Sequence, residues 1–450
     1  MMRNTLVIIL AAGMGKRMNS DKIKVLHKIA GKPMINYVLD QAYEISNDVV
    51  CVIGHQSEKV KNELNSYKNL SFVYQEEQLG TGHAVMQARN HIKGHKGPVL
   101  ILYGDTPLLK HETLKNLINK HISKSAGMSV LTSYLDDPTG YGRIIKDENG
   151  QLLDIIEEQD ANTNIKKINE INTGLYCFSS DLLIAALDNL NNDNNQGEYY
   201  LPEAINHIRK SNKIITESAD SKEILGVNDR EDLANAEYII RQRINREYMN
   251  KGVTLIDPKS TYIEEGVKIE KDVTIYPNTY IKSGTIIKKD VVIESNCLIA
   301  DTEISESVKI KHGSVILQST IGENTDVGPY AYLRPQTSIG KGCRIGNFVE
   351  LKKSSIGNES KVPHLSYVGN AKIGEKCNIG AGTIFANYDG FNKHETVLGD
   401  DVFIGSNTTL IAPVKLGNNS KTGAGSVVTK DVEDNSVVLG VPARLYKKDN

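Results

Sequence analysis

Two different periods of hydrophobic residues divide the chain into halves. In the first half, apolar runs rich in β-branched residues predict short buried strands, and stretches with helical spacing lie between them. The predicted strands span residues 5–12, 49–53, 71–75, 99–103 and 128–135. The predicted helices span residues 34–45, 83–91 and 114–122. This alternation predicts an α/β fold with a mostly parallel, Rossmann-like sheet, whose ligands bind at the carboxyl ends of the strands.

In the second half, one aliphatic residue recurs at every sixth position. One unbroken run contains Ile263, Ile269, Ile275, Ile281, Ile287, Ile293 and Ile299, and a second contains Val315, Ile321, Val327, Leu333, Ile339, Ile345 and Leu351. This period fits neither a helix nor an ordinary strand and is typical of a parallel β-helix built from hexapeptide repeats. The phase slips around residues 305–312 and again near 356, 373 and 385–398, where we expect loops to leave the coil. It resumes at Ile404, Leu410, Leu416, Thr422 and Val428.

Glycine follows many of the repeated aliphatic residues, as in Ile321-Gly322 and Ile339-Gly340. We expect these glycines at corners of the coil, where the backbone needs a small side chain or a positive φ.

A segment of helical character separates the two halves. Its apolar residues Leu233, Ala236, Ile240 and Ile244 have the spacing of one helical face. We therefore expect a domain of residues 1–228, a linker helix at 229–251 and a coil domain of residues 252–450.

Composition narrows the class of protein. The 450 residues exceed what one hydrophobic core usually serves, and the net charge of −2 gives no basic surface for nucleic acid. The apolar run at residues 6–12 is too short to span a membrane and lacks a cleavage pattern, so we expect a cytoplasmic protein without a membrane span. The five cysteines contain no C-x-x-C pair, which indicates reduced, buried thiols.

Candidate ligand-binding residues follow the predicted strands of the first half. The first strand ends in a turn with Gly13 and Gly15, followed by Lys16 and Arg17. This turn is either structural or binds a polyanion, because small residues let backbone N–H groups approach phosphates and cations neutralise them. It is neither a P-loop nor a dinucleotide fingerprint. Asp105, at the end of the fourth predicted strand, is either a helix cap or a ligand of a hard cation such as magnesium.

A set of motifs resembles a known family. The first ~230 residues resemble the sugar-1-phosphate nucleotidyltransferases, and with the hexapeptide coil the whole chain is similar to the bifunctional bacterial N-acetylglucosamine-1-phosphate uridyltransferases / glucosamine-1-phosphate acetyltransferases. The residues that carry the resemblance are 10–18, Lys24, Gln75, Gly80-Thr81, 103–105, 140–144, Glu157, 172–174 and Asn228.

The resemblance implies a role for each matched residue of the first half. Arg17 and Lys24 would bind phosphates and support catalysis, and Asp105 with Asn228 would hold Mg²⁺. Residues implied to bind the uridine nucleotide are Leu10, Ala11, Ala12, Gly13, Gln75, Gly80, Thr81, Tyr103 and Gly104. Residues implied to bind N-acetylglucosamine are Gly142, Glu157 and Asn172. An oxygen of the sugar phosphate would attack the α-phosphorus of UTP in line and release pyrophosphate.

In the left-handed coil of this family, three hexads make one turn, so residues 18 apart stack on neighbouring strands. Arg334 and Lys352 have this spacing, which favours a phosphate clamp over two solvated charges. Tyr388, Ser406 and Ala424 would form one column beside a groove for an elongated ligand.

The resemblance also implies the chemistry of the coil. His364 would be the general base of acetyl transfer, with Glu350 as one candidate to orient it. Arg334, Lys352, Tyr367 and Asn378 would bind glucosamine-1-phosphate. Residues implied to bind acetyl-CoA are Ala381, Asn387, Tyr388, Ser406, Ala424 and Arg444.

We therefore expect a two-site cytoplasmic enzyme that acetylates glucosamine-1-phosphate and then forms UDP-N-acetylglucosamine, a precursor of peptidoglycan, lipopolysaccharide or teichoic acid. The resemblance implies a homotrimer whose acetyltransferase sites are shared between subunits. One alternative is a single-activity nucleotidyltransferase whose coil serves assembly or regulation. A second is a scaffold protein with a degenerate α/β domain.

Overall fold

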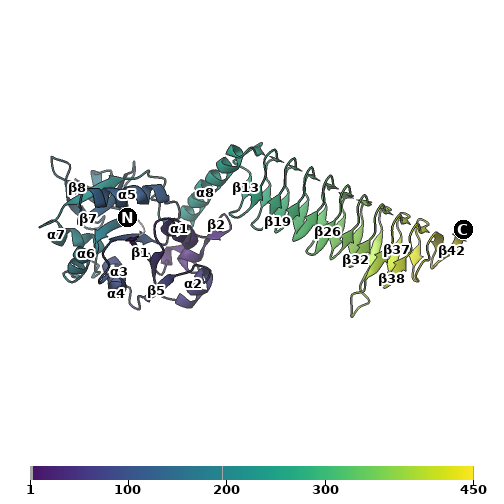
Figure 1. Cartoon of the computed structure of the whole chain (residues 1–450), viewed down its shortest axis with the longest axis horizontal. Coiled ribbons are helices and arrows are strands. Elements are labelled where there is room, and N and C mark those ends of the chain that lie inside the picture. The colour runs from purple at the N-terminus through teal and green to yellow at the C-terminus, as the bar shows by residue number, and fades with distance from the viewer. Residues whose placement is uncertain (1–3, 195, 449–450) are drawn as a thin grey trace. The chain divides into compact units, whose positions relative to one another are not determined.

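The computed structural model describes residues 4–194 and 196–448. The chain folds into two compact units, Met1–Ile240 and Arg241–Asn450, each with its own core. Figure 1 shows the α/β layers of the first unit and the stacked rungs of the second.

The first unit contains a mixed sheet of nine strands. Its main path runs β11-β7-β10-β6-β1-β4-β5, and off this path β8 pairs with β10 and β9 pairs with β8. The strands are β1 (Leu6–Ala11), β4 (Asp48–Ile53), β5 (Leu70–Tyr74), β6 (Pro98–Tyr103), β7 (Met128–Tyr134), β8 (Gly142–Lys146), β9 (Leu152–Ile156), β10 (Glu170–Ser179) and β11 (Ile214–Ser218). Strand β10 runs antiparallel to both β6 and β7, whereas β1, β4, β5 and β6 pair in parallel. The fold class predicted from the sequence is confirmed.

Helices cover both faces of this sheet. They are α1 (Met34–Tyr43), α2 (Ser57–Leu64), α3 (Thr81–Gln87), α4 (Arg89–Ile92), α5 (His111–Ser123), α6 (Ser180–Leu187) and α7 (Ala204–Ile208). Alternate residues of β1 point to opposite faces: Leu6 and Ile8 pack with α3, α6 and α7, while Val7 and Ile9 pack with α1 and α5. Because both faces are buried, β1 is continuously apolar.

Short segments complete the first unit. Two 3₁₀ turns follow β1, η2 (Lys16–Met18) and η3 (Lys24–Leu26), and a small hairpin joins β2 (Lys28–Ile29) to β3 (Lys32–Pro33). Two more 3₁₀ turns are η4 (Ile165–Lys167) and η5 (Leu201–Glu203).

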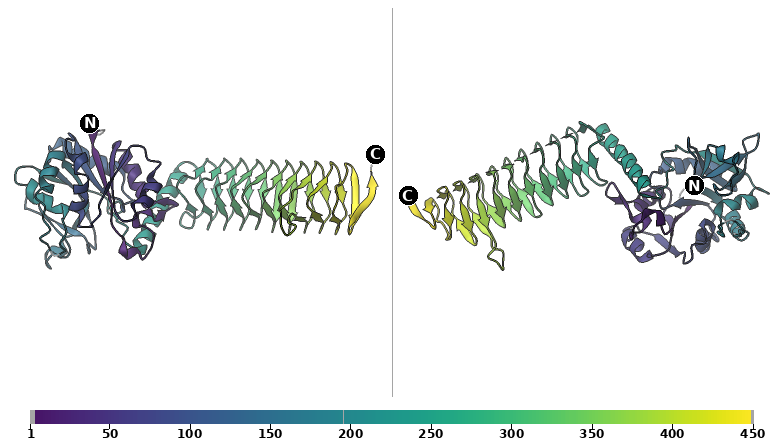
Figure 2. Two further views of the ribbon diagram at one scale, coloured as in Figure 1. Left: turned by 90° about the horizontal axis from the view of Figure 1, so that it is seen from below. Right: turned by 180° about the vertical axis from the view of Figure 1, so that it is seen from behind.

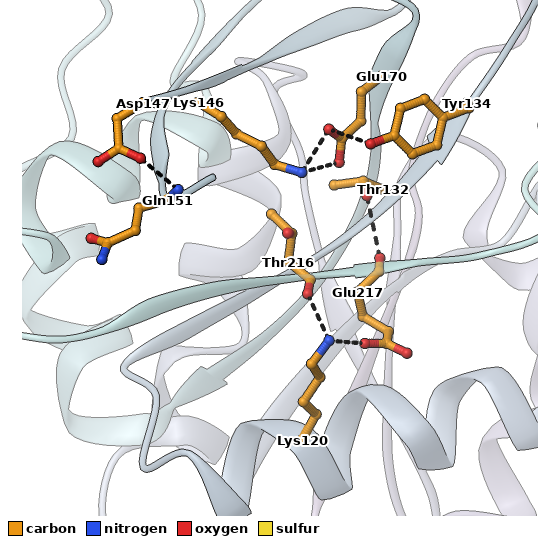
Figure 3. A network of polar contacts seen from close by, with 9 residues as sticks. All are labelled: Lys120, Thr132, Tyr134, Lys146, Asp147, Gln151, Glu170, Thr216 and Glu217. Atoms are coloured by element: carbon orange, nitrogen blue, oxygen red, sulfur yellow. Dashed lines mark hydrogen bonds and ion pairs between the residues drawn. The ribbon is translucent and has the colours of Figure 1, made fainter. Parts of the chain in front are cut away.

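Polar contacts connect β7, β10 and β11 to the neighbouring elements β8 and α5 (Figure 3). Lys146 Nζ lies 2.6 Å from both carboxylate oxygens of Glu170, and the hydroxyl of Tyr134 donates to Glu170 Oε2 at 3.0 Å. Lys120 of α5 pairs with Glu217 of β11. These charges neutralise one another in pairs, so the network anchors β8 and α5 to the sheet.

The second unit is a left-handed parallel β-helix with three sheets. We name them by their first strands. The β12 sheet contains β12 (Thr254–Leu255), β15 (Thr274–Ile275), β18 (Val292–Ile293), β21 (Lys309–Ile310), β24 (Asp326–Val327), β27 (Arg344–Asn347), β30 (Lys361–His364), β33 (Asn378–Ile379), β36 (Phe403–Ile404), β39 (Lys421–Thr422), β41 (Ser436–Gly440) and β42 (Ala443–Lys448). The β13 sheet contains β13 (Tyr262–Ile263), β16 (Tyr280–Ile281), β19 (Leu298–Ala300), β22 (Val315–Leu317), β25 (Tyr332–Leu333), β28 (Glu350–Lys352), β31 (Tyr367–Gly369), β34 (Ile384–Ala386), β37 (Thr409–Ile411) and β40 (Val427–Val428). The β14 sheet contains β14 (Lys268–Ile269), β17 (Ile286–Ile287), β20 (Glu303–Ile304), β23 (Ser319–Ile321), β26 (Thr337–Ile339), β29 (Ser355–Ile356), β32 (Ala371–Ile373), β35 (Thr396–Leu398) and β38 (Val414–Leu416).

The repeated aliphatic residues form the core of the coil, one per strand. In the β13 sheet, Ile281 pairs with Ile299, which is 18 residues further on, and Ile299 pairs with Ile316, which is 17 further on. The prediction of Val315 in this series is wrong, because Ile316 is fully buried and Val315 is not. The phase slips at Ile304, Ile321, Ile356 and Ile373 therefore come from rungs that are one residue shorter. Within residues 241–448, one loop leaves the coil, between Phe385 and Leu398 (Figure 1), so the loops expected at the other phase slips were predicted wrongly.

The glycines after the repeated residues occupy crowded positions. A Cβ on Gly322 would lie 2.6 Å from the carbonyl carbon of Gly340, and one on Gly340 would lie 2.8 Å from the amide nitrogen of Asn358. Neither glycine has a positive φ. The small-side-chain explanation is therefore correct at these two positions and the positive-φ explanation is wrong.

A helix lies at one end of the coil and a hairpin at the other. The helix α8 (Arg230–Asn250) runs from the first unit into the second, where Asn245 donates to the carbonyl oxygen of Thr261 at 3.0 Å and Arg241 lies 4.1 Å over the ring of Tyr262. At the other end, β41 pairs antiparallel with β42. Figure 2 shows parallel rungs between these ends. Within 4–194 and 196–448, no helix combines the length and apolarity needed to cross a bilayer.

Candidate active sites

A cavity of about 280 Å³ opens in the first unit at the carboxyl ends of β1 and β6. Most of the residues expected to bind nucleotide line it. The lining contains Leu10, Ala11, Ala12, Gly13, Gly15, Lys24, Val25, Gln75, Gln78, Gly80, Thr81, Ala84, Tyr103, Asp105 and Glu198. Gly104 is adjacent, because its N–H donates to the carbonyl oxygen of Leu10 at 2.9 Å.

The turn after β1 brings the cations into this cavity. Gly15 has a φ of +63°, and a Cβ there would lie 2.6 Å from the Cβ of Lys24. Both the left-handed conformation and the close approach require glycine. Lys24 can therefore pack directly against the turn that carries Arg17.

Lys24 is the centre of the polar contacts in the cavity. Its Nζ lies 2.6 Å from Asp105 Oδ2 and 3.0 Å from Asn228 Oδ1. Arg17 Nη2 donates to the same Asn228 oxygen at 3.0 Å. The N–H of Val227 donates to the carbonyl oxygen of Asp105 at 2.8 Å, which holds the distant segment in place. The structure thus brings together all four residues expected to bind phosphate or metal.

The other end of the cavity presents an amide. Gln75 follows β5, and its Nε2 donates to the carbonyl oxygen of Gly80 at 3.1 Å. Gly80 has a φ of +100°, and a Cβ there would meet the carbonyl oxygen of Tyr199 at 2.8 Å. Gln78 also lines the cavity and donates to the carbonyl oxygen of Ala12 at 2.9 Å. Gln78 was not predicted from the sequence, although it lies between Gln75 and Gly80.

The residues expected to bind N-acetylglucosamine lie together beside this cavity. Asn172 of β10 pairs with Gly142 of β8, and a Cβ on Gly142 would lie 3.1 Å from Glu157 Oε1. Tyr103, which lines the cavity, packs against Gly174, where a Cβ would lie 2.6 Å from its ring. Burial raises the pKa of the Glu157 carboxyl, and Asp160 adds to the effect.

The cations of the coil form a second cluster. Leu333 pairs with Leu351, so the next residues, Arg334 and Lys352, stack as their spacing predicts. Arg334 Nη1 lies 2.8 Å from Glu350 Oε1. The pKa of Lys352 is lowered, first by its contact with Lys393 and then by Arg334. Three neighbouring cations, of which Arg334 is paired with the carboxylate of Glu350, thus leave an excess of positive charge for an anion.

Lys393 was not predicted from the sequence. It lies in the loop that leaves the coil between Phe385 and Leu398, where its backbone forms an antiparallel β-bridge with Tyr388. The change in repeat phase predicted a loop, but the repeat pattern does not show which loop residue contacts the coil.

His364 stands at the head of a column of small residues. It ends β30, and the N–H of Gly382 donates to its carbonyl oxygen at 3.2 Å. The column continues through backbone hydrogen bonds from Asn407 to Ala381 and from Gly425 to Ser406, both 2.7 Å long. The members are His364, Ala381, Ser406 and Ala424.

The prediction that Tyr388 belongs to this column is wrong. Ala386 pairs with Ile411 in the β13 sheet, so Tyr388 leaves the coil from a different face. The reason is the loop, which lengthens this rung from 17 or 18 residues to the 25 between Phe385 and Leu410. Asn387 remains on the coil, where its Nδ2 donates to Asn370 Oδ1 at 2.8 Å.

The remaining predicted residues lie on neighbouring strands. Tyr367 pairs with Glu350 in the β13 sheet, and Asn378 pairs with Lys361 in the β12 sheet. Arg444 pairs with Leu439 in the closing hairpin, and Leu439 lies against Gly423, beside Ala424. Arg444 is therefore near the far end of the column.

Side-chain oxygen atoms of Asp105 and Asn228 are the candidate metal ligands of the first site. In the described part of the chain, His, Cys, Asp and Glu residues form no group of three or more that could hold a metal ion. One carboxylate and one amide nevertheless fit Mg²⁺, which commonly takes one or two protein ligands and completes its shell with substrate phosphates and water.

Comparison with known proteins separates the two halves in the same way. Residues 6–221 match the family model of nucleotidyl transferases, residues 266–301 match the bacterial transferase hexapeptide repeat, and residues 318–420 match the GMPPB C-terminal domain. The fold and the two sites thus define a nucleotidyl transferase joined to a hexapeptide-repeat transferase.

Curated proteins match over almost the full length of the chain, and two clostridial ones serve as examples. The bifunctional protein GlmU of Clostridium botulinum (strain Kyoto / Type A2) is 47% identical over 443 residues, covering 98% of this chain and 96% of that protein. The protein of the same name from Clostridium perfringens (strain SM101 / Type A) is 50% identical over 439 residues, covering 97% and 96%. The chain belongs to the GlmU family. It is a bifunctional enzyme of UDP-N-acetylglucosamine synthesis, a uridyltransferase and an acetyltransferase.

Proposed function

We propose that the cavity of the first unit is the uridyltransferase site and that the His364 column is the acetyltransferase site. Glucosamine-1-phosphate is acetylated first, and N-acetylglucosamine-1-phosphate then reacts with UTP. The two reactions divide between residues 1–228 and 252–450, with the segment 229–251 as the connection. We place both in the cytoplasm, where UTP and acetyl-CoA are made.

Uridylyl transfer depends on the contacts of Lys24. Lys24 and Arg17 neutralise the phosphates of UTP, while Gln75 and the backbone of Gly80 and Thr81 bind uracil through its donor and acceptor edge. The sugar phosphate oxygen attacks the α-phosphorus in line, and pyrophosphate leaves. Positioning and charge neutralisation are sufficient, since this transfer needs no covalent nucleophile.

Asp105 and Asn228 hold Mg²⁺ in this proposal. The ion supplies positive charge beside the phosphates when it is bound. In the described structure, both oxygens face Lys24 Nζ at 2.6 and 3.0 Å, so the same oxygens serve a cation in either case.

Gly142, Glu157 and Asn172 bind the sugar. The absence of a side chain at Gly142 leaves the carboxylate of Glu157 accessible, and a buried carboxylate is a strong acceptor for sugar hydroxyl groups.

Acetyl transfer uses His364 as the general base. The imidazole takes a proton from the amine of glucosamine-1-phosphate as the nitrogen attacks the thioester carbon of acetyl-CoA, and the C–S bond breaks to release CoA. Arg334 and Lys352 bind the phosphate of the sugar, assisted by Lys393, with Tyr367 and Asn378 beside it. The small residues Ala381, Ser406 and Ala424 leave room along the coil for the pantetheine arm, while Asn387, Tyr388 and Arg444 complete the acetyl-CoA site.

The main support for this proposal is the register of the column formed by His364, Ala381, Ser406 and Ala424. His364 lies directly before three rungs of small side chains. An elongated thioester that lies along these rungs would therefore end beside its general base. A purely structural coil has no need to end such a groove at a histidine, so the register favours two activities over a single nucleotidyltransferase.

We also propose a homotrimer that shares its acetyltransferase sites. The outward residues of the β13 sheet are mostly apolar and include Tyr262, Tyr280, Leu298, Val315, Tyr332, Tyr367 and Ile384. Those of the β12 sheet include the charged residues Lys309, Asp326, Arg344, Lys361 and Lys421.

The corner beside His364 supports the same assembly. Tyr330, Phe348 and Leu365 are 49%, 58% and 60% exposed, and their φ angles lie between 52° and 55°, a strained conformation for bulky residues. Other corners in this column carry glycine or asparagine. A second copy of the chain that covers these three residues offsets the cost of their exposure.

Separating the two activities in variants tests the assignment. Asp105→Ala should abolish uridylyl transfer and leave acetylation near normal, and His364→Ala should do the reverse, lowering acetyl turnover about 10²–10⁴-fold. Each reaction is assayed alone, with UTP, Mg²⁺ and N-acetylglucosamine-1-phosphate or with acetyl-CoA and glucosamine-1-phosphate. If either variant keeps normal turnover in its own reaction, that assignment fails.

A further inference from the structure

The ring of His364 has a defined partner one rung away. Asn347 is the last residue of β27, His364 is the last residue of β30, and the two pair in register. Asn347 Oδ1 lies 2.6 Å from His364 Nδ1. The N–H of Leu365 also donates to the carbonyl oxygen of Asn347 at 3.0 Å, so the two backbones are fixed relative to each other.

This contact replaces the expected partner. Glu350 was a candidate to orient His364, but its carboxylate lies 2.8 Å from Arg334 and belongs to the phosphate cluster. The imidazole of His364 is exposed, and an exposed side chain without a partner rotates freely. A hydrogen bond to Asn347 restricts that rotation.

We propose that Asn347 is a positioning residue for acetyl transfer, which holds the His364 ring with Nδ1 protonated and Nε2 free. This inference rests on the assignment of His364 as the general base. The amide oxygen can only accept a hydrogen bond, so Nδ1 must donate. The lone pair of the neutral ring is then on Nε2, which can receive the proton of the attacking amine.

The amide of Asn347 is uncharged, and this matters for its positioning role. When the C–N bond forms and the C–S bond breaks, the proton moves from the amine nitrogen to Nε2 and the ring becomes a cation. The Nδ1–H bond to Asn347 is kept in both states. A carboxylate in the same place would favour the charged ring before the reaction and leave less of the free base at neutral pH.

Three substitutions separate this role from a structural one. Asn347→Ala removes the acceptor and should lower the kcat of acetylation more than about 10-fold but less than His364→Ala does, with little change in either KM. Asn347→Asp restores an acceptor and should recover turnover at high pH. Its acidic limb of kcat/KM should shift to higher pH, because a carboxylate raises the pKa of the ring. Uridylyl transfer by the same full-length chains is the internal control.

A double variant provides the sharpest outcome. If Asn347 acts through His364, then Asn347→Ala should have no further effect on turnover in a His364→Ala background. Arg344→Ala, an exposed position on the same strand, is the matched control and should keep wild-type acetylation.

Two failures can be told apart. Normal turnover in His364→Ala overturns the base assignment and the inference with it. A large loss in His364→Ala combined with normal turnover in Asn347→Ala, an unshifted pH profile in Asn347→Asp, or additive losses in the double variant overturns the positioning role alone.

Discussion

The proposed role of Lys352 in binding phosphate comes with an electrostatic cost in the free protein. Its pKa is lowered, first by Lys393 and then by Arg334, because neighbouring positive charges disfavour a further one. In the proposed complex, a phosphate dianion bound in the cluster would reverse this effect, so the repulsion belongs to the free coil.

Replacing Lys352 should move stability and affinity in opposite directions. Lys352→Gln should weaken binding of glucosamine-1-phosphate about 10–100-fold, the usual value of a charge-assisted hydrogen bond to phosphate. The same change should slightly raise the midpoint of thermal unfolding of the coil, since it relieves repulsion.

The pH dependence has a definite sign. The folded-state pKa of Lys352 lies below its unfolded value, so its charging destabilises the coil at lower pH and the penalty fades as pH rises through the folded-state pKa. The stability gain of Lys352→Gln should shrink correspondingly in alkaline buffer. Calorimetry across pH and titration with the sugar phosphate measure the two effects, and a loss of stability would contradict the repulsion argument.

At the residue scale, the sequence predicted those contacts that follow from the repeat period of the coil. The stacking of Arg334 on Lys352 follows from a spacing of 18 residues on regular rungs. The same arithmetic failed for Tyr388, because the loop changes the length of its rung. Lys393 and Asn347 were missed because each acts through a contact that spacing does not describe until the register is known.

Strands and helices were predictable where burial is continuous. The five predicted strands of the first unit are all present within one residue of their expected ends, since buried parallel strands are apolar throughout. The predicted helix at 83–91 is divided between α3 and α4. Strands β8 to β11 were not predicted, because hydrogen bonds to distant partners, such as Asn172 to Gly142, define them more than local pattern does.

Two kinds of glycine in the coil should respond differently to alanine. A Cβ on Gly322 would lie 2.6 Å from the backbone of Gly340, whereas Gly266 has open space and a φ of +83°. Gly322→Ala must force two rungs apart and should cost about 3 kcal/mol or more, while Gly266→Ala should cost only the 1–2 kcal/mol of a left-handed alanine. Chemical denaturation of the two variants measures the difference. A loss in Gly322→Ala no larger than that in Gly266→Ala would contradict the argument that spacing between rungs selects glycine after the repeated residues.

At the scale of the whole molecule, one face of the coil is mostly apolar where the β12 sheet carries several charged residues. The apolar outward residues of the β13 sheet and the corner of Tyr330, Phe348 and Leu365 are adjacent. Sequence periodicity predicted a coil but could not distinguish its faces, because which residue points outward on which sheet depends on the positions of the short rungs.

The proposed trimer makes a prediction about this corner. Light scattering should give about three times the chain mass of 49.6 kDa. Phe348→Asn, which relieves the strained φ, should stabilise an isolated chain by about 1 kcal/mol but weaken the trimer and lower acetylation. Uridylyl transfer should not change.

Phe403→Ser serves as a control, because Phe403 is 47% exposed but lies on the β12 sheet, away from this corner. A wild-type chain that acetylates fully as a monomer would refute the shared site. A dissociated Phe403→Ser variant would show that another face makes the contact.

The closing hairpin of β41 and β42 limits how far the coil can grow. A parallel coil ends in unpaired N–H and C=O groups, which template the next strand of any chain that meets them. Here the last rung turns back on itself, and its outermost strand carries Arg444 and Lys447, whose charges oppose pairing with another copy. With Asn245 of α8 at the opposite end, the coil has a fixed length and resists end-to-end fibre formation, even though its strands stack in parallel as those of an amyloid do.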